Sequence, residues 1–289
     1  MAKNGIIKLH YEGNIVTDHR VTARTLGKTL IHLQNALDRA YLETKYGNLW
    51  KHARMRGEDY LTADFTALYP EEGGFIQKLT STSDVGKKLV DRISRAMKPA
   101  VEKLMQEGEE EATSISQQLE TRKVQVAKGI VEPKGFEEIF DKPDKKMIRS
   151  YGDRSINREI DQVLSIIRSP HAGESTMELS VVGEKSANYN FNKYTSEKFH
   201  KIVSKREIGS PVLYVVQVRV LDRERLNGKV KNLVNDKTSL LHFSSEEDFI
   251  KAHPYLANKK EMVFIGAPLI EYGAFDPNAG DIYFLDLVK

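Results

Sequence analysis

The sequence predicts an α+β protein built from three consecutive parts. An apolar helical stripe near the N-terminus and a high density of β-branched runs after residue 175 are the main observations. The best-specified stretch is Pro211 to Asn232, where apolar and polar residues alternate and then reach Asn227-Gly228. Alternation with a period of two is typical of a strand, and Asn-Gly between two such runs indicates a hairpin. We expect a βαββ unit over residues 1–82, a helical segment over 83–170 and a β-rich domain over 171–289.

The first part begins with a predicted strand over residues 6–11. Thr22 is expected to cap a helix that runs to about Thr44, because its apolar residues recur every three or four positions. These residues are Leu26, Leu30, Leu33, Leu37 and Tyr41. Alternating apolar residues over 61–69 and a second run over 75–79 predict a hairpin. The result is a mainly antiparallel sheet with a helix packed on it.

The middle part is predicted to be helical. Asp84 is a good N-cap for a helix in which Pro99 should cause a kink or a split, because proline lacks the amide hydrogen. Residues 109–128 form a second predicted helix with a weak apolar stripe. It is polar enough to be a solvated arm or one face of an oligomer contact. Glycines and prolines over 129–153 indicate a linker, and another helix is expected over 155–168.

Strands dominate the last part. The expected strands are residues 177–182, 212–221, 230–233, 239–243, 262–270 and 281–287. A short helix interrupts them over 245–256, where Ser-Ser-Glu-Glu resembles a capping box. Several short strands with one intervening helix predict a barrel-like or strongly twisted antiparallel sheet.

Composition excludes several classes of protein. With 40% hydrophobic and 29% charged residues, the chain has the composition of a folded domain. It has no cysteine, which removes disulfides, thiolate nucleophiles and cysteine-bound metals. The N-terminus has no signal-peptide core, and no apolar run approaches the roughly 18 residues of a membrane span. We therefore expect a cytoplasmic protein with no membrane partner.

Positive charge is concentrated near the predicted hairpin. The net charge of +3 is too small to indicate nucleic-acid binding by itself, but residues 205–237 hold eight basic and four acidic residues. Five cations on one ribbon would give salt-sensitive affinity for phosphates. These candidate binding residues are Arg219, Arg223, Arg225, Lys229 and Lys231. Asp222 and Glu224 dilute the charge, and a charged edge strand also prevents aggregation without any ligand.

A second candidate anion site lies at the expected start of the helix over 155–168. Arg154 and Arg158 are four residues apart, and the backbone N–H groups of a helix N-terminus attract anions. The simpler interpretation is an Asp153 or Ser155 cap with surface ion pairs.

Motifs for catalysis and for cofactors are absent from the sequence. It contains no GxxxxGK[ST], GxGxxG, GxSxG or HExxH pattern. The loop 276–281 offers oxygen ligands for Ca²⁺ or Mg²⁺, but its residues are also ordinary turn formers. We therefore expect no metal and no cofactor.

Three functional classes follow from these observations. The first is a non-enzymatic binding or regulatory protein of prokaryotic or viral origin, which acts through a protein partner or its own oligomer. Its support is the polar helix over 109–128 and the lack of a catalytic signature. The second is a nucleic-acid-binding protein that uses the hairpin over 219–231. The third is an enzyme or sensor for a phosphorylated or nucleotide ligand, with Asp153, Arg154 and Arg158 in the site.

Overall fold

A computed structural model describes residues 4–47, 49–51, 53–81, 83–105, 113–142, 145–258, 260–274, 276, 278 and 280–288, and only the backbone of residues 145–150. The chain forms two compact units, each assembled from separated segments. Unit 1 comprises residues 1–49, 53–109 and 152–204, and unit 2 comprises residues 50–52, 110–151 and 205–289. These units cut across the three consecutive parts expected from the sequence, 1–82, 83–170 and 171–289.

Unit 1 is built on a five-stranded antiparallel sheet with the order β2-β3-β1-β5-β6. Its strands are β1 (Gly5–Glu12), β2 (Thr66–Ala67), β3 (Phe75–Ser81), β5 (Thr176–Val182) and β6 (Ser186–Phe191). The first strand of the chain lies in the middle, so that Leu9 pairs with Gln77 on one side and with Leu179 on the other. Buried and half-buried residues alternate along β1, which is the pattern of a sheet with one covered face.

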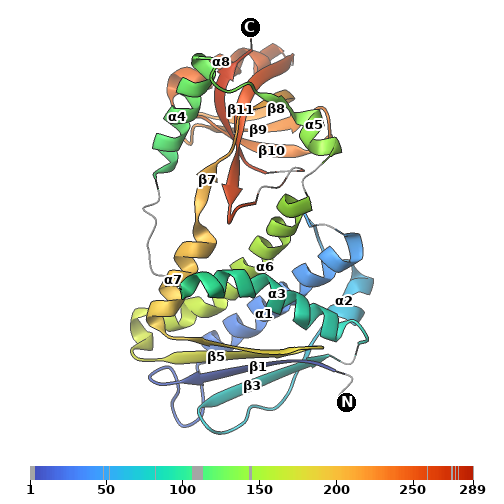
Figure 1. Ribbon diagram of the computed structural model, residues 1–289, viewed down its shortest axis with the longest axis vertical. Coiled ribbons are helices and arrows are strands. Elements are labelled where there is room, and N and C mark those ends of the chain that lie inside the picture. The colour runs from blue at the N-terminus through green and yellow to red at the C-terminus, as the bar shows by residue number, and fades with distance from the viewer. Residues whose placement is uncertain are drawn as a thin grey trace. The chain divides into compact units, whose positions relative to one another are not determined.

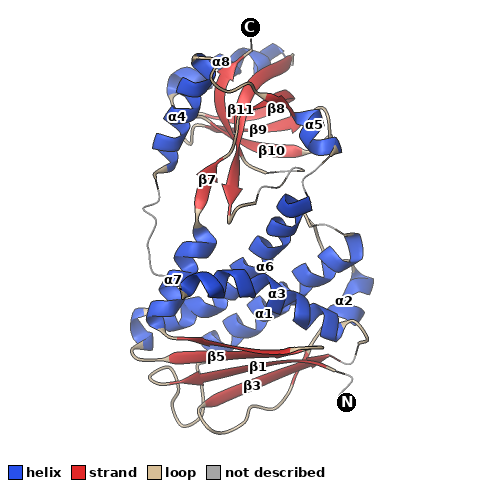
Figure 2. Cartoon of the chain, viewed as in Figure 1, coloured by secondary structure: helices blue, strands red, loops and turns tan. Residues whose placement is uncertain are grey.

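Helices cover one face of this sheet (Figure 2). They are α1 (Ala23–Tyr46), α3 (Gly86–Leu104), α7 (Lys193–Ser204) and the part of α6 (Lys145–Arg168) from residue 152 onward. The predicted cap of the first helix is confirmed, because the Thr22 side chain accepts a hydrogen bond from the Thr25 amide. The helix ends at Gly47, whose φ of 74° favours glycine. The expected split at Pro99 is wrong, since α3 continues through it to Leu104.

A buried ionic group joins three of these helices. Arg92 of α3 lies 2.7 Å from Glu43 Oε2 of α1 and 2.7 Å from Asp153 Oδ1 of α6. The side chain of Arg92 is 4% exposed, and those of Glu43 and Asp153 are 11% and 16% exposed. Gly152 provides the space, because a Cβ there would lie 2.5 Å from Glu43 Oε2.

Two further expectations need correction. Residues 61–69 are not one strand: α2 (Gly57–Ala63) occupies the beginning, and only β2 pairs with β3. Alternation over this range therefore reflected a short helix followed by an edge strand. Residues 129–153 are not simply a linker either. They contain β4 (Lys134–Gly135), α5 (Phe136–Asp141) and the first turns of α6, which starts ten residues before the helix expected at 155.

The segment after the helix over 155–168 also departs from expectation. A short 3₁₀ helix, η1 (Pro170–Ala172), leads into β5, and β5 pairs with β1 in unit 1. Residues 171–204 therefore belong to unit 1, where β5 and β6 join the sheet of β1, whereas the sequence assigned them to the C-terminal domain. Alternation identifies a strand but carries no information about which distant strand becomes its partner.

Unit 2 is built around a closed five-stranded barrel, as the strand pattern predicted. Its strands are β8 (Val212–Asp222), β9 (Asn227–Asn232), β10 (Thr238–His242), β11 (Glu261–Glu271) and β12 (Ile282–Leu287). They follow the order β8-β9-β10-β12-β11, and pairing of β11 with β8 closes the barrel. Helix α8 (Glu246–Asn258) connects β10 to β11, and β10 runs parallel to β12. This connectivity resembles that of the OB fold, a five-stranded Greek-key barrel.

Aromatic rings fill the barrel interior. Tyr214, Phe264 and Phe284 stack in succession, with centroid distances of 5.4 and 5.6 Å. Phe136 of α5 continues the stack at 5.3 Å from Tyr214, and Phe249 of α8 adds a ring edge through Phe243. The interior is therefore a packed core, so any ligand site of the barrel lies on its outer surface or at its loops.

Two short elements extend the barrel wall. β4 runs parallel to the start of β8, and β7 (Arg206–Ile208) pairs with the end of β11. The remaining helix, α4 (Ile115–Ala127), packs against β7 and β12 (Figure 1). Among the described residues, no helix is long and apolar enough to cross a membrane.

Candidate nucleic-acid interface

The β8–β9 hairpin forms, but its turn is not where the sequence placed it. The turn consists of residues 223–226, and Asn227 and Gly228 are the first residues of β9, paired with Asp222 and Leu221. Asn-Gly turns require positive φ values. Here Leu226, the residue before Asn227, has the positive φ, at 45°. Its carbonyl accepts a hydrogen bond from the Phe243 amide at 2.9 Å, which ties the turn to the end of β10.

A β-bulge sets the direction of the cations on this hairpin. Val218 pairs with Val230 and Val220 pairs with Lys229, so Arg219 is the extra residue between them and is exposed. Along β9, Lys229 and Lys231 alternate with buried residues and therefore face outward. We call the outward side chains of β8 beyond Val216, of β9 and of β10, together with the turn 223–226, the ribbon face.

The two arginines of the turn are exposed and weakly paired. Arg223 lies 3.4 Å from Glu246, and its side chain is 70% exposed. Arg225 lies 3.9 Å from Asp222 and is 80% exposed. Ion pairs this exposed contribute little to stability, so both arginines can exchange their partners for phosphates.

The strand cations differ in how they are compensated. Lys231 pairs with Asp236, and this hydrogen bond lowers the pKa of the Asp236 carboxyl. Within the described part of the chain, neither Arg219 nor Lys229 forms an ion pair. The structure thus brings all five predicted cations of the hairpin to one ribbon. Arg219 lacks a direct ion pair among the described residues, although its charge helps to lower the pKa of Asp236.

The other two predicted anion-binding residues lie elsewhere. Arg154 and Arg158 belong to unit 1 and sit well inside α6, which starts at Lys145. The backbone N–H groups around them are therefore used within the helix, and the premise of a helix N-terminus at this position is wrong. Asp153, the expected cap, instead pairs with Arg92 in the buried ionic group.

A ring pair beside the hairpin was missed as a functional feature. The parallel register places His242 of β10 opposite Tyr283 of β12, and their rings stack with centroids 4.9 Å apart at an angle of 23°. His242 Nε2 lies 3.3 Å from Asp281 Oδ2, and Lys51 Nζ lies 2.6 Å from Asp281 Oδ1. His242 falls within the strand expected over 239–243, but nothing local revealed its parallel partner.

The Asp281 carboxylate is held in its charged form. Burial alone would raise its pKa, but hydrogen bonds from His242 and Lys51 outweigh burial and lower the pKa to about 2. The neighbouring Asp276 accepts hydrogen bonds from the amides of Lys51 and Asn278. The carboxylates of Asp276 and Asp281, two of the candidate oxygen ligands in loop 276–281, are therefore engaged in turn and ion-pair contacts.

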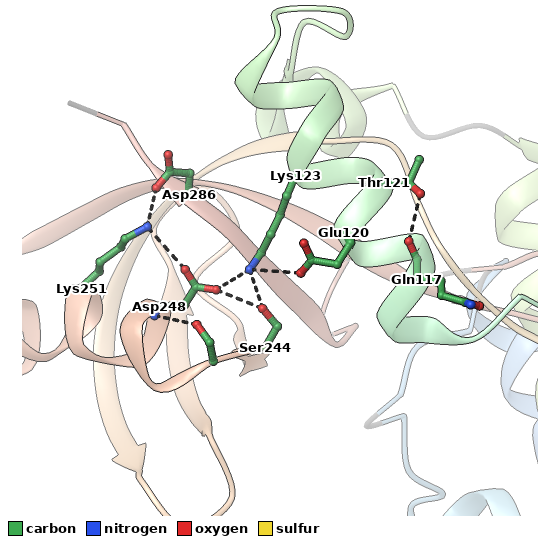
Figure 3. A network of polar contacts seen from close by, with 9 residues as sticks. Gln117, Glu120, Thr121, Lys123, Ser244, Asp248, Lys251 and Asp286 are labelled. Atoms are coloured by element: carbon green, nitrogen blue, oxygen red, sulfur yellow. Dashed lines mark hydrogen bonds and ion pairs between the residues drawn. The ribbon is translucent and has the colours of Figure 1, made fainter.

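Helix α4 is attached to the barrel through a network of polar contacts (Figure 3). Lys123 Nζ lies 2.6 Å from Asp248 Oδ2 of α8, and Ser244 and Lys251 also contact this carboxylate. Burial raises the pKa of Asp248, but the hydrogen bond and the charge of Lys123 outweigh it, so the pKa is lowered. Leu119 is buried on the outer surface of β11 and β12.

The predicted solvated arm is therefore corrected for residues 115–127. The apolar stripe of this helix faces the barrel, where Ile115 and Val126 pack around Leu119. Residues 109–112, which the arm was expected to include, lie outside the described residues. The outer wall at β11 and β12 is covered by α4, and the ribbon face over β8, β9 and β10 is the wall left with exposed cations.

Comparison of the chain with protein-family models, with curated proteins and with solved structures finds no match. In the part of the chain that the structure describes, no group of three or more His, Asp or Glu side chains converges as metal ligands would. The ribbon face is thus the surface whose chemistry best indicates a ligand.

Proposed function

We propose that unit 2 binds nucleic acid through the ribbon face of its barrel. The observation that carries this proposal is the pair of exposed cations, Arg219 and Lys229, which form no direct ion pair among the described residues and lie beside the exposed arginines of the turn 223–226. A phosphate backbone presents regularly spaced negative charge and would match a row of cations along one hairpin.

The connectivity of the barrel supports the same surface. OB barrels bind oligonucleotides or oligosaccharides over their second and third strands, between the loop joining strands one and two and the loop joining strands four and five. In this chain those strands are β9 and β10, and the first of the loops is the turn 223–226. Fold alone does not establish function, but here Lys229 and Lys231 occupy the corresponding strand β9, and Arg223 and Arg225 occupy the corresponding loop, while Arg219 lies on β8.

The hypothesis of an oligomer formed through α4 rested on an exposed helical arm, and the structure does not show such an arm over residues 115–127. The apolar stripe of that helix is used against the barrel, and Lys123 is used in the pair with Asp248. The nucleotide-ligand hypothesis at Arg154 and Arg158 has likewise lost its helix N-terminus. Neither is carried forward as a second function.

Salt-dependent binding to a labelled oligonucleotide tests the proposal. Wild-type protein should bind at about 50 mM salt and lose affinity steeply toward about 200 mM. The double variant Arg219→Ala/Lys229→Ala should weaken binding and reduce the slope of log affinity against log salt by about 1 to 2.

Lys98→Ala is the matched control for lost charge. Lys98 is 71% exposed on α3 of unit 1 and lies 3.8 Å from Glu102, so its removal should leave binding unchanged. Failure of the wild-type protein to bind any oligonucleotide at low salt would overturn the proposal. Equal losses in Lys98→Ala and in the double variant would show that net charge, and not the ribbon face, is responsible.

A further inference from the structure

We infer that the stacked rings of His242 and Tyr283 form a platform for an unpaired base, so that the ligand of the ribbon face is single-stranded. This inference rests on the proposed function and adds the class of nucleic acid and the residue that selects it. In a duplex each base is covered above and below, whereas a single strand offers its base faces to flat side chains.

The platform is rigid before any ligand arrives. The imidazole of His242 lies against Tyr283 and is held at its edge by Asp281, which is itself fixed by Lys51. The His242 side chain is 26% exposed, so part of the ring remains open to solvent while the stack supports the rest. A ring fixed in this way loses little conformational entropy when a base stacks on it.

The surroundings of the platform suit a base and not a phosphate. Asn227 lies directly opposite His242 on β9 and offers an amide group for hydrogen bonds to a base edge. Asp281 and Asp222 lie on the same side and are paired with Lys51 and Arg225, so the two carboxylates compete with a phosphate for these cations.

Two positions further along the strands, the character of the surface changes. Lys229 pairs with Leu240 on one side and with Val220 on the other, so a cation stands between two apolar side chains. The next cross-strand pair, Lys231 and Thr238, adds a second cation. The cations of β9 thus attract phosphates, while the ring platform accepts a base. A nucleic acid can make both contacts only if its bases are unpaired.

A comparison of single-stranded and duplex oligonucleotides of the same sequence tests this inference at constant salt. Wild-type protein should bind the single strand at least about tenfold more tightly than the duplex. His242→Ala should weaken single-strand binding by roughly tenfold, because base stacking on one ring is lost. The salt dependence should stay unchanged, since no phosphate contact is removed.

His242→Phe keeps a flat ring at this position without the contact to Asp281. It should retain most of the single-strand affinity, which separates loss of stacking from loss of the hydrogen bond. A 2-aminopurine base in the oligonucleotide should be quenched by the wild-type protein and by His242→Phe, but not by His242→Ala. Thermal unfolding of each variant shows that the barrel is intact.

The outcomes separate the two proposals. If no oligonucleotide binds to the wild-type protein, nucleic-acid binding by the ribbon face fails and the platform fails with it. If duplex and single strand bind equally and His242→Ala binds as well as wild type, the platform is wrong while nucleic-acid binding by the ribbon face stands. If His242→Phe is as weak as His242→Ala, the histidine acts through its contact with Asp281 and not as a stacking surface.

Discussion

Gly228 lies so close to Val220 across the β8–β9 hairpin that a Cβ at this position would come within 2.6 Å of the Val220 carbonyl oxygen. The close approach occurs beside the bulge at Arg219, where the two strands change register. A glycine in the strand therefore allows the bulge, and the bulge exposes the arginine.

Gly228→Ala should destabilise unit 2 by about 1–3 kcal/mol, because the clash is with backbone that must shift. Denaturant unfolding followed by circular dichroism measures the change. Gly27→Ala is the matched control: nothing lies within 4 Å of a Cβ at this exposed helical position, so it should stabilise α1 by about 0.5–1 kcal/mol. Equal stability of the two variants would contradict the role assigned to the close approach.

Lys123→Met should destabilise unit 2 by about 1–3 kcal/mol. The change leaves Asp248, whose side chain is 6% exposed, without its principal cation, although Ser244 and Lys251 still contact it. Chemical denaturation gives the free energy of unfolding. Glu120→Gln removes an exposed partner 3.9 Å from the same lysine and should have no measurable effect. A Lys123→Met variant as stable as wild type would show that this ion pair does not attach α4.

The Asp281 carboxyl should make stability depend on pH under acidic conditions. Its pKa of about 2 in the folded protein is below its ordinary value of 3.8, so its contribution is fully present above about pH 4 and is lost as the pH falls toward 2. The contribution is at most about 2 kcal/mol and is reduced by screening of the partly exposed Lys51.

Asp281→Asn should therefore lower stability at neutral pH and flatten the loss of stability between pH 4 and pH 2. Unfolding curves measured at several pH values in this range provide the test. Glu224→Gln, a change of the same charge in the exposed turn, should leave the acid limb as it is in wild type. If Asp281→Asn loses stability between pH 4 and pH 2 as steeply as wild type does, Asp281 is not the group responsible for this pH dependence.

Arg92→Met should destabilise unit 1 by about 3–5 kcal/mol, because it leaves the mostly buried carboxylates of Glu43 and Asp153 without their shared cation. Thermal and denaturant unfolding both report the change. The neighbouring Arg95 is exposed on the same helix, and Arg95→Met should change stability little. Similar losses in the two variants would mean that helix charge, and not the buried group, is responsible.

Local patterns predicted elements better than they predicted partners. Alternation identified β8 and β11 almost to the residue, because buried and exposed positions there have a period of two. The same pattern identified β5 but placed it in the wrong unit, since its partner β1 lies at the other end of the chain. Pairing depends on the whole fold, and one strand alone does not contain it.

The candidate site was also only partly predictable from local sequence patterns. The cations of the hairpin were predictable, because residues near one turn in sequence are also near in space. His242 and Tyr283 meet through a parallel pairing of β10 and β12 after a crossover through α8. The sequence around either residue therefore gave no indication of the other. Lys51 reaches Asp281 from a distant segment of the chain and had no local signal at all.

The central position of β1 has a consequence during synthesis. This strand leaves the ribosome well before one of its two neighbours, β5, which ends at Val182. Until that residue has been translated, one long edge of β1 carries backbone N–H and C=O groups without their final partners. Between the synthesis of β1 and that of β5, this edge of the strand must therefore be kept out of intermolecular contacts.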